Sequence, residues 1–227
     1  MTITLNVQAD VIDIASDNPQ PDDIFLVDTN VWLWQTYLSS QLSSPAFTDF
    51  SSSTPRRLGD RRKAQNKITQ YTPYIKDALV ANSKLLYVGL TFSELAHIIE
   101  KLEYEIYKNT NGLPDLDIKE FRHSLSSQRS NVVFKVKEVW EEIEELGNSA
   151  DVFINDKTTQ SALARFQTQA LDGYDLFLLE AVSQTGSERI QVLTDDMDYA
   201  TVKGIQVFTS NGLTIQEARA QNKLLVR

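Results

Sequence analysis

Short runs of apolar and β-branched side chains recur along the chain, each bounded by polar or turn-forming residues. Such runs are typical of buried strands. They lie at residues 24–29 (IFLVDT), 84–91 (KLLYVGLT), 189–195 (RIQVLTD) and 204–210 (GIQVFTS). Three of them precede a helical pattern, and strands that alternate with helices indicate a parallel sheet covered on both faces. We therefore expect an α/β protein with three layers, α/β/α, around a central and mainly parallel sheet.

Helical spacing marks much of the remaining chain. Residues 92–107 and 132–146 carry apolar side chains every three or four positions, which predicts amphipathic helices. Residues 175–184 are apolar nearly all round, which predicts a helix buried on every side.

The stretches between these patterns suggest how the chain is divided. We expect a polar arm at residues 1–22, a main domain at 23–212 and a C-terminal helix at 213–227. Within the domain, the Ser-rich and basic composition of residues 39–67 predicts a loop. Residues from about 108 to 170 are expected to form a helical insertion between the second and third of the four strand-like runs.

The composition is that of an ordinary soluble globular protein, with 227 residues, 41% of them hydrophobic. No apolar run approaches the ~18 residues of a membrane span, so no membrane partner is expected. The N-terminus has no secretory pattern. Cysteine is absent, which leaves no disulfide frame and no thiolate metal site, and a cytoplasmic location is the expectation.

Charge is distributed unevenly along the chain. The net charge of −9 argues against a protein that coats nucleic acid, because phosphate contacts need Lys and Arg. One segment is nevertheless basic, and its side chains are candidates for RNA phosphate contacts: Arg56, Arg57, Arg61, Arg62, Lys63 and Lys67. The alternative is a solvated basic loop without a ligand.

Four carboxylates follow strands or open helices on what should be one edge of the sheet. Asp28 ends the first run, Glu94 follows the second, Asp175 opens the buried helix and Asp196 follows the third, with Asp198 beside it. Parallel α/β sheets bind ligands at the carboxyl ends of their strands. We therefore expect these side chains to converge.

Each of these acids also has a purely structural interpretation. Asp28 has a residue type favoured at a helix N-cap, and Thr91 with Glu94 has the spacing of a capping box. Asp175 would complement a helix dipole, and the segment around Asp196 could form a turn. Caps alone do not explain why all four acids belong to the same sheet edge.

Converging carboxylates repel one another and need a compensating charge. With no Cys and two His in the chain, an all-oxygen site for a hard divalent cation is the metal site that this sequence can build. Such a site suits phosphodiester hydrolysis, in which a metal activates water and neutralises developing charge.

The motifs, taken in order, resemble those of the PIN domain family. FLVDTNVWLW resembles its first motif, TFSELAHIIE its second, GYDLFLLEAV its third, and VLTDDMDY its fourth, while GIQVFTSN resembles the closing strand. The resemblance covers about residues 23–212. It implies a PIN-like nuclease domain over that range.

The resemblance also implies a function. PIN domains are typically Mg²⁺- or Mn²⁺-dependent nucleases acting mostly on RNA, and many bacterial members are VapC-like toxins held by an antitoxin, often as dimers. An endoribonuclease is therefore expected, with RNA as substrate and with an antitoxin and a homodimer among its implied partners. Carried over by position, the catalytic metal ligands are Asp28, Glu94, Asp175 and Asp196, with Asp198 accessory and Thr29, Asn30 and Thr194 as supporting polar groups. Asp195 fills a variable position of the fourth motif, and Asp172 stands three residues before Asp175.

Other functions compete with this one. Glu94 with His97 and Glu120 with His123 both have Glu-x-x-His spacing, which occurs in di-iron helical bundles. A phosphoaspartyl enzyme would also place Asp28 after a first strand, but it would need a second acid where Asn30 stands. A PIN-like binding module without catalysis is a third alternative.

Overall fold

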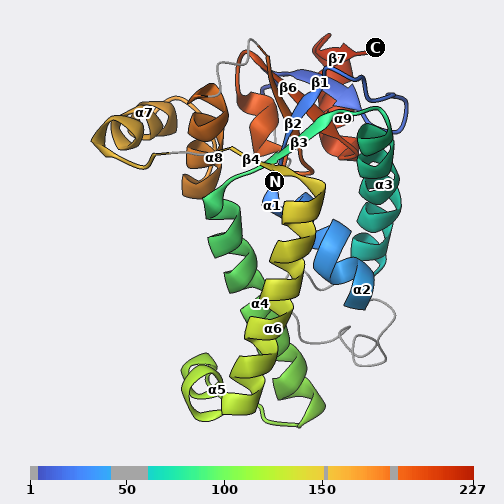
Figure 1. Cartoon of the computed structure of the whole chain (residues 1–227). Coiled ribbons are helices and arrows are strands. Elements are labelled where there is room, and N and C mark those ends of the chain that lie inside the picture. Colours follow the sequence, from blue (N-terminus) through green and yellow to red (C-terminus); the bar gives the residue numbers. More distant parts are fainter. Residues whose placement is uncertain (1–4, 42–60, 151–152, 185–188) are drawn as a thin grey trace.

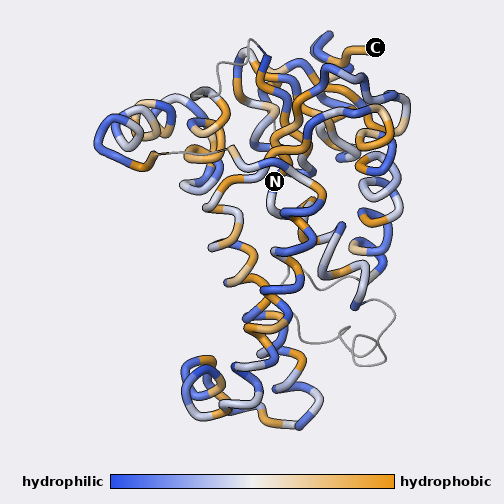
Figure 2. Tube along the Cα trace, in the orientation of Figure 1, coloured by the Kyte–Doolittle hydropathy of each residue, from blue (hydrophilic) through white to orange (hydrophobic). Residues whose placement is uncertain are grey.

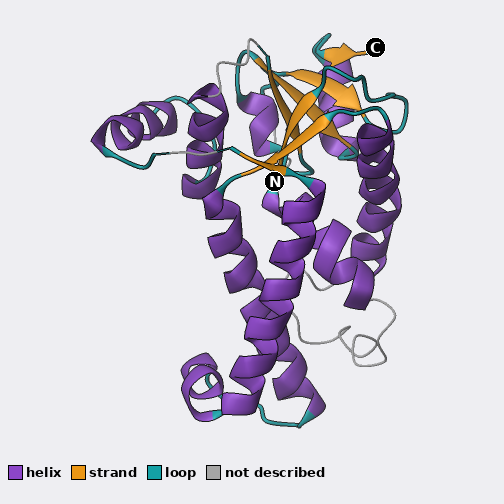
Figure 3. Ribbon diagram, in the orientation of Figure 1, coloured by secondary structure: helices purple, strands orange, loops and turns teal. Residues whose placement is uncertain are grey.

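The structure, a computed structural model, describes residues 5–41, 61–150, 153–184 and 189–227. Its centre is a seven-stranded sheet in which every strand pair of the described residues is parallel (Figure 3). The strands lie in the order β4-β3-β2-β5-β6-β1-β7. Their bounds are β1 Asp10–Asp13, β2 Ile24–Val27, β3 Lys84–Tyr87, β4 Asn148–Ser149, β5 Ile190–Leu193, β6 Ile205–Thr209 and β7 Leu224–Leu225. The expected α/β class and the four strand-like runs are confirmed.

Helices cover both faces of this sheet. They are α1 Thr29–Leu33, which continues as a π-helix over Trp34–Leu38, then α2 Ser39–Gln41, α3 Arg61–Val80, α4 Gly89–Thr110, α5 Ile118–Ser124, α6 Ser126–Leu146, α7 Asp156–Phe166, α8 Gly173–Gln184 and α9 Gly212–Ala220, with a 3-10 turn at Asp198–Thr201. No helix within the described ranges is long and apolar enough to cross a membrane.

Alternation along the strands produces the two helical layers, because successive side chains of a strand point to opposite faces. Phe25 and Val27 of β2 pack in one hydrophobic cluster, with α1, α3 and α4 to α6. Leu26 packs in the other cluster, with α7, α8 and α9. Figure 2 shows hydrophobic positions gathered in the sheet, whereas the helices mix both kinds of residue. The expected α/β/α layering follows from this pattern.

The helices α4, α5 and α6 form an arm that projects away from the sheet (Figure 1). Charged groups join its helices, since the buried carboxylate of Glu100 accepts hydrogen bonds from Arg122 and Arg129. Glu103 accepts another from Lys135, at 2.7 Å. Pairing of this kind lets an acid be buried within the arm at a tolerable cost.

The expected polar arm at residues 1–22 is wrong. Residues 10–13 are strand β1, which lies between β6 and β7. Just before this strand, Leu5, Val7 and Ala9 are buried in the hydrophobic core while Asn6 and Gln8 are exposed. Polar residues lie between and around these buried positions, so the apolar pattern is not evident in the sequence.

The expected helix over residues 213–227 is also wrong in its second half. Helix α9 ends at Ala220, and the chain turns at Asn222, whose φ is 56°. It then returns as the strand β7 beside β1. Asn can adopt a left-handed conformation at modest cost, which allows the chain to turn here.

Two internal boundaries differ from expectation as well. The expected loop at 39–67 is helical at both ends, since α2 covers 39–41 and α3 begins at Arg61, while 42–60 lie outside the described residues. The expected insertion at about 108–170 does contain helices, but it also contains β4, which extends the sheet beside β3. Two residues are too short a strand to give a periodic signal.

Candidate functional site

The candidate site lies where the path of the chain across the sheet reverses. From β2 the chain passes to β3 on one side, and it later returns to β5 on the other side of β2. Open α/β sheets bind ligands at such a switch point, outside the carboxyl ends of the strands. Asp28 directly follows β2 here, and its backbone N–H donates to the carbonyl oxygen of Leu193, the last residue of β5, at 3.1 Å.

The Asp28 side chain is buried, at 3% exposure, and it does not cap a helix. Although Asp28 occupies the N-cap position of α1, its side chain makes no capping hydrogen bond. Its Oδ2 instead accepts from the Thr194 hydroxyl at 2.7 Å, and the same hydroxyl oxygen accepts from the backbone N–H of Asp196 at 2.9 Å. Thr194 therefore links the two acids, and a capping role for the Asp28 side chain is wrong.

Asp175 lies in the first turn of α8, where the neighbouring acid provides the cap. Oδ1 of Asp172 accepts from the backbone N–H groups of Tyr174 and Asp175, at 2.9 and 3.1 Å. The Asp175 carboxylate, 7% exposed, instead accepts from the hydroxyl of the buried Tyr199 at 2.7 Å. This side chain is thus held on the inner side of the helix rather than turned back to its own backbone.

Glu94 is not part of a capping box either. Helix α4 begins at Gly89, so Thr91 stands at its third position and Glu94 lies in the second turn. The Thr91 hydroxyl lies 3.5 Å from the backbone N–H of Val88, the N-cap residue. The capping-box interpretation of Thr91 and Glu94 is therefore wrong, and the carboxylate of Glu94 acts electrostatically on Asp28.

Burial and mutual repulsion disfavour ionisation in this group of acids. Burial raises the pKa of Asp28 to about 7, and the charges of Glu94 and Asp196 add to this, against hydrogen bonds from Thr194 and Asn30. Burial, and then the charge of Asp28, raise the pKa of Asp175 to about 8, against the hydrogen bond from Tyr199. Effects of this size are characteristic of functional sites as well as of strained ion networks.

Asp28 and Asp175 differ from the other buried acids of the described residues. Each of the others forms an ion pair with an Arg or Lys: Asp17, Asp23, Glu100, Glu103 and Glu180. No such pair involves Asp28 or Asp175 in the parts of the chain that the structure describes. A buried carboxylate without a cation is costly, so this pair leaves room for a positive charge that the described residues do not supply.

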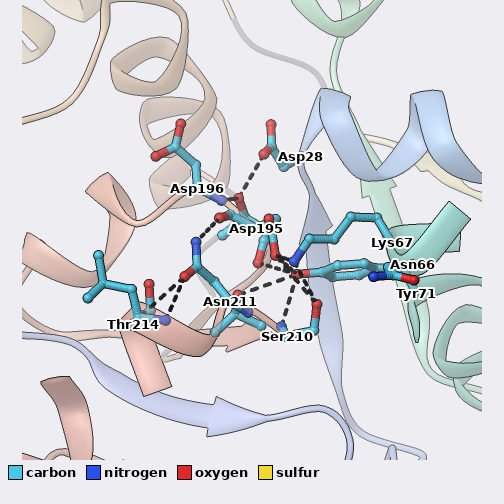
Figure 4. A network of polar contacts seen from close by, with 12 residues as sticks. Asp28, Asn66, Lys67, Tyr71, Asp195, Asp196, Ser210, Asn211 and Thr214 are labelled. Carbon is cyan, nitrogen blue, oxygen red and sulfur yellow. Dashed lines mark hydrogen bonds and ion pairs between the residues drawn. The ribbon is translucent and has the colours of Figure 1, made fainter. Parts of the chain in front are cut away.

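The donor set fits a hard divalent cation, because it consists of carboxylate oxygens. In their present conformations, no three His, Asp or Glu side chains within the described ranges are grouped closely enough to hold one ion. One oxygen of Asp196 is occupied, since Oδ1 accepts from the backbone N–H of Asp198 at 2.9 Å. Figure 4 shows the carboxyl groups of Asp28 and Asp196 directed to the same side of the loop that carries Asp195.

The residues expected to support the acids, Thr29 and Asn30, and the accessory acid Asp198 differ in their contacts. Thr29 is fully buried, and its hydroxyl has no hydrogen-bond partner among the described residues. The Asn30 side chain favours the charged form of Asp28. Asp198 opens the 3-10 turn, and burial raises its pKa, assisted by the charges of Asp196 and Asp172. An orphaned buried hydroxyl beside Asp28 is compatible with a ligand at this edge.

The basic candidates divide into three kinds. Arg56 and Arg57 lie outside the described residues, and Arg61 to Lys63 occupy the first turn of α3. Lys67, one turn further along, reaches the sheet edge, where its ammonium pairs with Asp195.

The two Glu-x-x-His motifs do not form a di-iron bundle. A bundle requires an all-helical fold, whereas this chain is built on a parallel sheet. His97 and His123 are both exposed, on α4 and in the last turn of α5.

Several residues of this edge were not expected from the sequence. Tyr199 occupies the aromatic position of the fourth motif, and that position was the available signal for it. Nothing local indicated that Asp172 would cap α8, beyond its being a favoured capping type three residues before Asp175. The contacts of Tyr71 and Lys67 with Asp195 join positions far apart in the chain, and periodicity does not predict them.

No family model, curated protein or solved structure matches this chain. The similarity to PIN domains therefore rests on the order of the motifs in the sequence.

Proposed function

We propose that this chain is a PIN-like, metal-dependent endoribonuclease that hydrolyses RNA phosphodiester bonds at the carboxyl edge of the sheet. One observation carries the proposal: Asp28 and Asp175 are the buried acids of the described residues that have no Arg or Lys partner. They lie at a topological switch point, and Glu94 and Asp196 act on Asp28 electrostatically.

In this proposal Asp28, Glu94, Asp175 and Asp196 hold Mg²⁺ or Mn²⁺, with Asp198 accessory. The bound metal would activate a water molecule and neutralise charge on the phosphate. The residues of the chain prepare the site before the metal binds, because Thr194 orients Asp28 and fixes the loop of Asp196.

Protonation should control metal binding at this site. Metal ligands must be ionised, so binding releases protons and strengthens with pH. With pKa values of about 7 for Asp28 and about 8 for Asp175, metal affinity should rise between about pH 6 and about pH 8.5, the range in which both carboxyl groups ionise. Isothermal titration calorimetry in two buffers of different ionisation enthalpy measures the protons released.

The substitution Asp28→Asn tests the proposed activity, since it keeps the shape of the side chain and removes its charge. We expect cleavage of labelled single-stranded RNA with Mn²⁺ or Mg²⁺ to fall by at least about 100-fold, because a metal supplies several kcal/mol of charge stabilisation. Asp156→Asn, an exposed acid in the first turn of α7, is the matched control. Full activity of Asp28→Asn, or equal activity in EDTA, would refute the proposal.

A second candidate is a PIN-like binding module without catalysis. It is favoured by the absence, among the described residues, of three acidic side chains grouped to hold one ion. This function requires RNA or protein binding that persists in EDTA, together with no cleavage and no stabilisation by Mn²⁺. The motif resemblance is also the basis for proposing a toxin role with an antitoxin, and a homodimer. Growth arrest on expression of the wild type but not of Asp28→Asn would support the toxin role.

A further inference from the structure

The ammonium of Lys67 is held at the margin of the carboxylate site. Lys67 lies on α3, and its Nζ stands 2.5 Å from Oδ1 of Asp195 and 3.3 Å from the Ser210 hydroxyl (Figure 4). Asp195 immediately precedes Asp196, so the sequence places this cation one residue from a proposed metal ligand. The two side chains of the ion pair are 21% and 18% exposed, so solvent reaches both.

A buried tyrosine fixes this margin relative to the acids. The hydroxyl of Tyr71, one turn after Lys67 on α3, lies 2.9 Å from the carbonyl oxygen of Thr194 and accepts from the backbone N–H of Ser210 at 3.0 Å. Thr194 is the residue whose own hydroxyl binds Asp28. Helix α3 and the loops after β5 and β6 are thereby pinned together, and Lys67 has a defined position beside the site.

Further positive charge continues from Lys67 along α3. Lys63 is four residues earlier, hence on the same ridge of the helix and about 5–6 Å away between Cβ atoms. Lys63 and Arg62 are exposed. On a chain with a net charge of −9, a basic ridge that ends at the carboxylate edge is the surface suited to a polyanion.

We propose that Lys67 binds a backbone phosphate of single-stranded RNA beside the carboxylate site, and that Asp195 is the internal competitor that the phosphate displaces. This inference rests on the proposed function for its substrate. A lysine ammonium has three N–H donors and no fixed geometry. Solvent reaches both side chains of the pair, and Asp195 keeps the Tyr71 hydroxyl as a donor at 3.0 Å when a phosphate oxygen takes its place on Lys67. Asp195 is then not a metal ligand but the group that pairs with Lys67 until RNA binds.

The salt dependence of RNA binding tests the contact directly. A fluorescein-labelled 12-nucleotide RNA is titrated with the protein in EDTA, which prevents metal-dependent cleavage, over a series of KCl concentrations. For single strands, each phosphate contact contributes about 0.7 to the slope of log K against log salt. Lys67→Ala should reduce that slope by about 0.7 and lower affinity roughly eightfold at 0.05 M salt. The loss should be equal for RNAs of different sequence.

Matched variants separate this contact from general charge and from folding. Lys76→Ala removes an exposed lysine from the same helix and should leave the slope unchanged, whereas Lys67→Arg should retain it. Asp195→Asn removes the competitor and should tighten binding roughly two- to fivefold, the factor that corresponds to a partly exposed ion pair. The double variant Lys67→Ala with Asp195→Asn leaves neither charge unpaired, so it keeps the test valid if Lys67→Ala alone is unstable.

The outcomes distinguish this proposal from the nuclease proposal. An unchanged slope for Lys67→Ala, weaker binding by Asp195→Asn, or no RNA binding by the wild type in EDTA would each overturn the Lys67 site. Lys67-dependent binding without any metal-dependent cleavage would keep the Lys67 site and reject the nuclease. Metal-dependent cleavage that is lost in Asp28→Asn, together with a salt slope that does not depend on Lys67, would keep the nuclease and reject the Lys67 site.

Discussion

Replacing Asp28 by Asn should make the metal-free protein more stable at alkaline pH. The unfolded chain loses the Asp28 proton near pH 3.8, whereas the folded protein keeps it until about pH 7. Between these values the folded state binds more protons, so the free energy of unfolding falls as pH rises. Each unit of pKa difference between the folded and unfolded states corresponds to about 1.4 kcal/mol. The difference between 3.8 and about 7 for Asp28 therefore corresponds to roughly 4 kcal/mol.

Asn carries no charge at any of these pH values, so the free energy of unfolding of the variant does not decrease for this reason as the pH rises. The stability gained by Asp28→Asn should be close to zero below pH 4 and should grow to about 4 kcal/mol above pH 7. The charge of Asp28 is also one cause of the raised pKa of Asp175. Removing it makes Asp175 easier to ionise in the folded protein, which adds to the gain at alkaline pH.

Urea unfolding in EDTA at pH 5 and pH 8, followed by circular dichroism, measures the difference, with Asp156→Asn as control. Adding Mn²⁺ at pH 8 should then stabilise the wild type, by about 2.7 kcal/mol at a hundred times the dissociation constant, and should leave Asp28→Asn nearly unchanged. An equal difference between the two proteins at both pH values, or a less stable Asp28→Asn at pH 8, would refute the electrostatic reasoning.

Two further substitutions test ion pairing and packing elsewhere in the fold. Arg227→Ala should lower the free energy of unfolding by about 3–5 kcal/mol, because it leaves the buried carboxylates of Asp17 and Asp23 unpaired. Burial disfavours the charged form of Asp23, but hydrogen bonds from Arg227 and other groups hold its pKa below the ordinary 3.8. The stabilisation that this lowered pKa gives is lost as the pH falls below about 4. Urea unfolding between pH 3 and 6 should therefore show a smaller dependence of stability on pH in the variant. Phe121→Ala should lower the free energy of unfolding by about 3–5 kcal/mol, because Phe121 is 1% exposed in the arm. Amide hydrogen exchange should be accelerated more in α5 and α6 than in β5. An equal acceleration in all three elements would contradict an effect centred on the arm.

The sequence predicts the strands that are apolar on both faces but not their neighbours. Most residues of the four strand-like runs are apolar or β-branched, and such runs can be recognised without knowledge of the fold. β1 is four residues long, with Val11 and Ile12 buried between the half-buried Asp10 and Asp13, so in the sequence it resembles a polar arm. The strand order β3-β2-β5 depends on contacts between distant segments, so the switch point that gives Asp28 its position cannot be derived from local spacing.

The candidate site shows the same division between local and distant information. The ends of strands and the starts of helices identify Asp28, Asp175 and Asp196 from the sequence. Whether each acid caps a helix depends on where that helix begins, and a difference of two or three residues decides it, as for Glu94. The Lys67–Asp195 pair joins residues 128 positions apart, and no periodic pattern extends over such a separation.

The way in which buried charge is compensated connects these observations. The other buried acids of the described residues have an Arg or Lys partner within the protein, whereas Asp28 and Asp175 have the neutral donors Thr194 and Tyr199. Neutral hydrogen bonds orient a carboxylate but return only part of the desolvation cost. A cation does arrive at this edge, in the form of Lys67, yet it pairs with Asp195 rather than with either buried acid. Among the described residues, positive charge thus lies at the margin and none pairs with Asp28 or Asp175, and the metal ion and RNA phosphate that we propose would complete this arrangement.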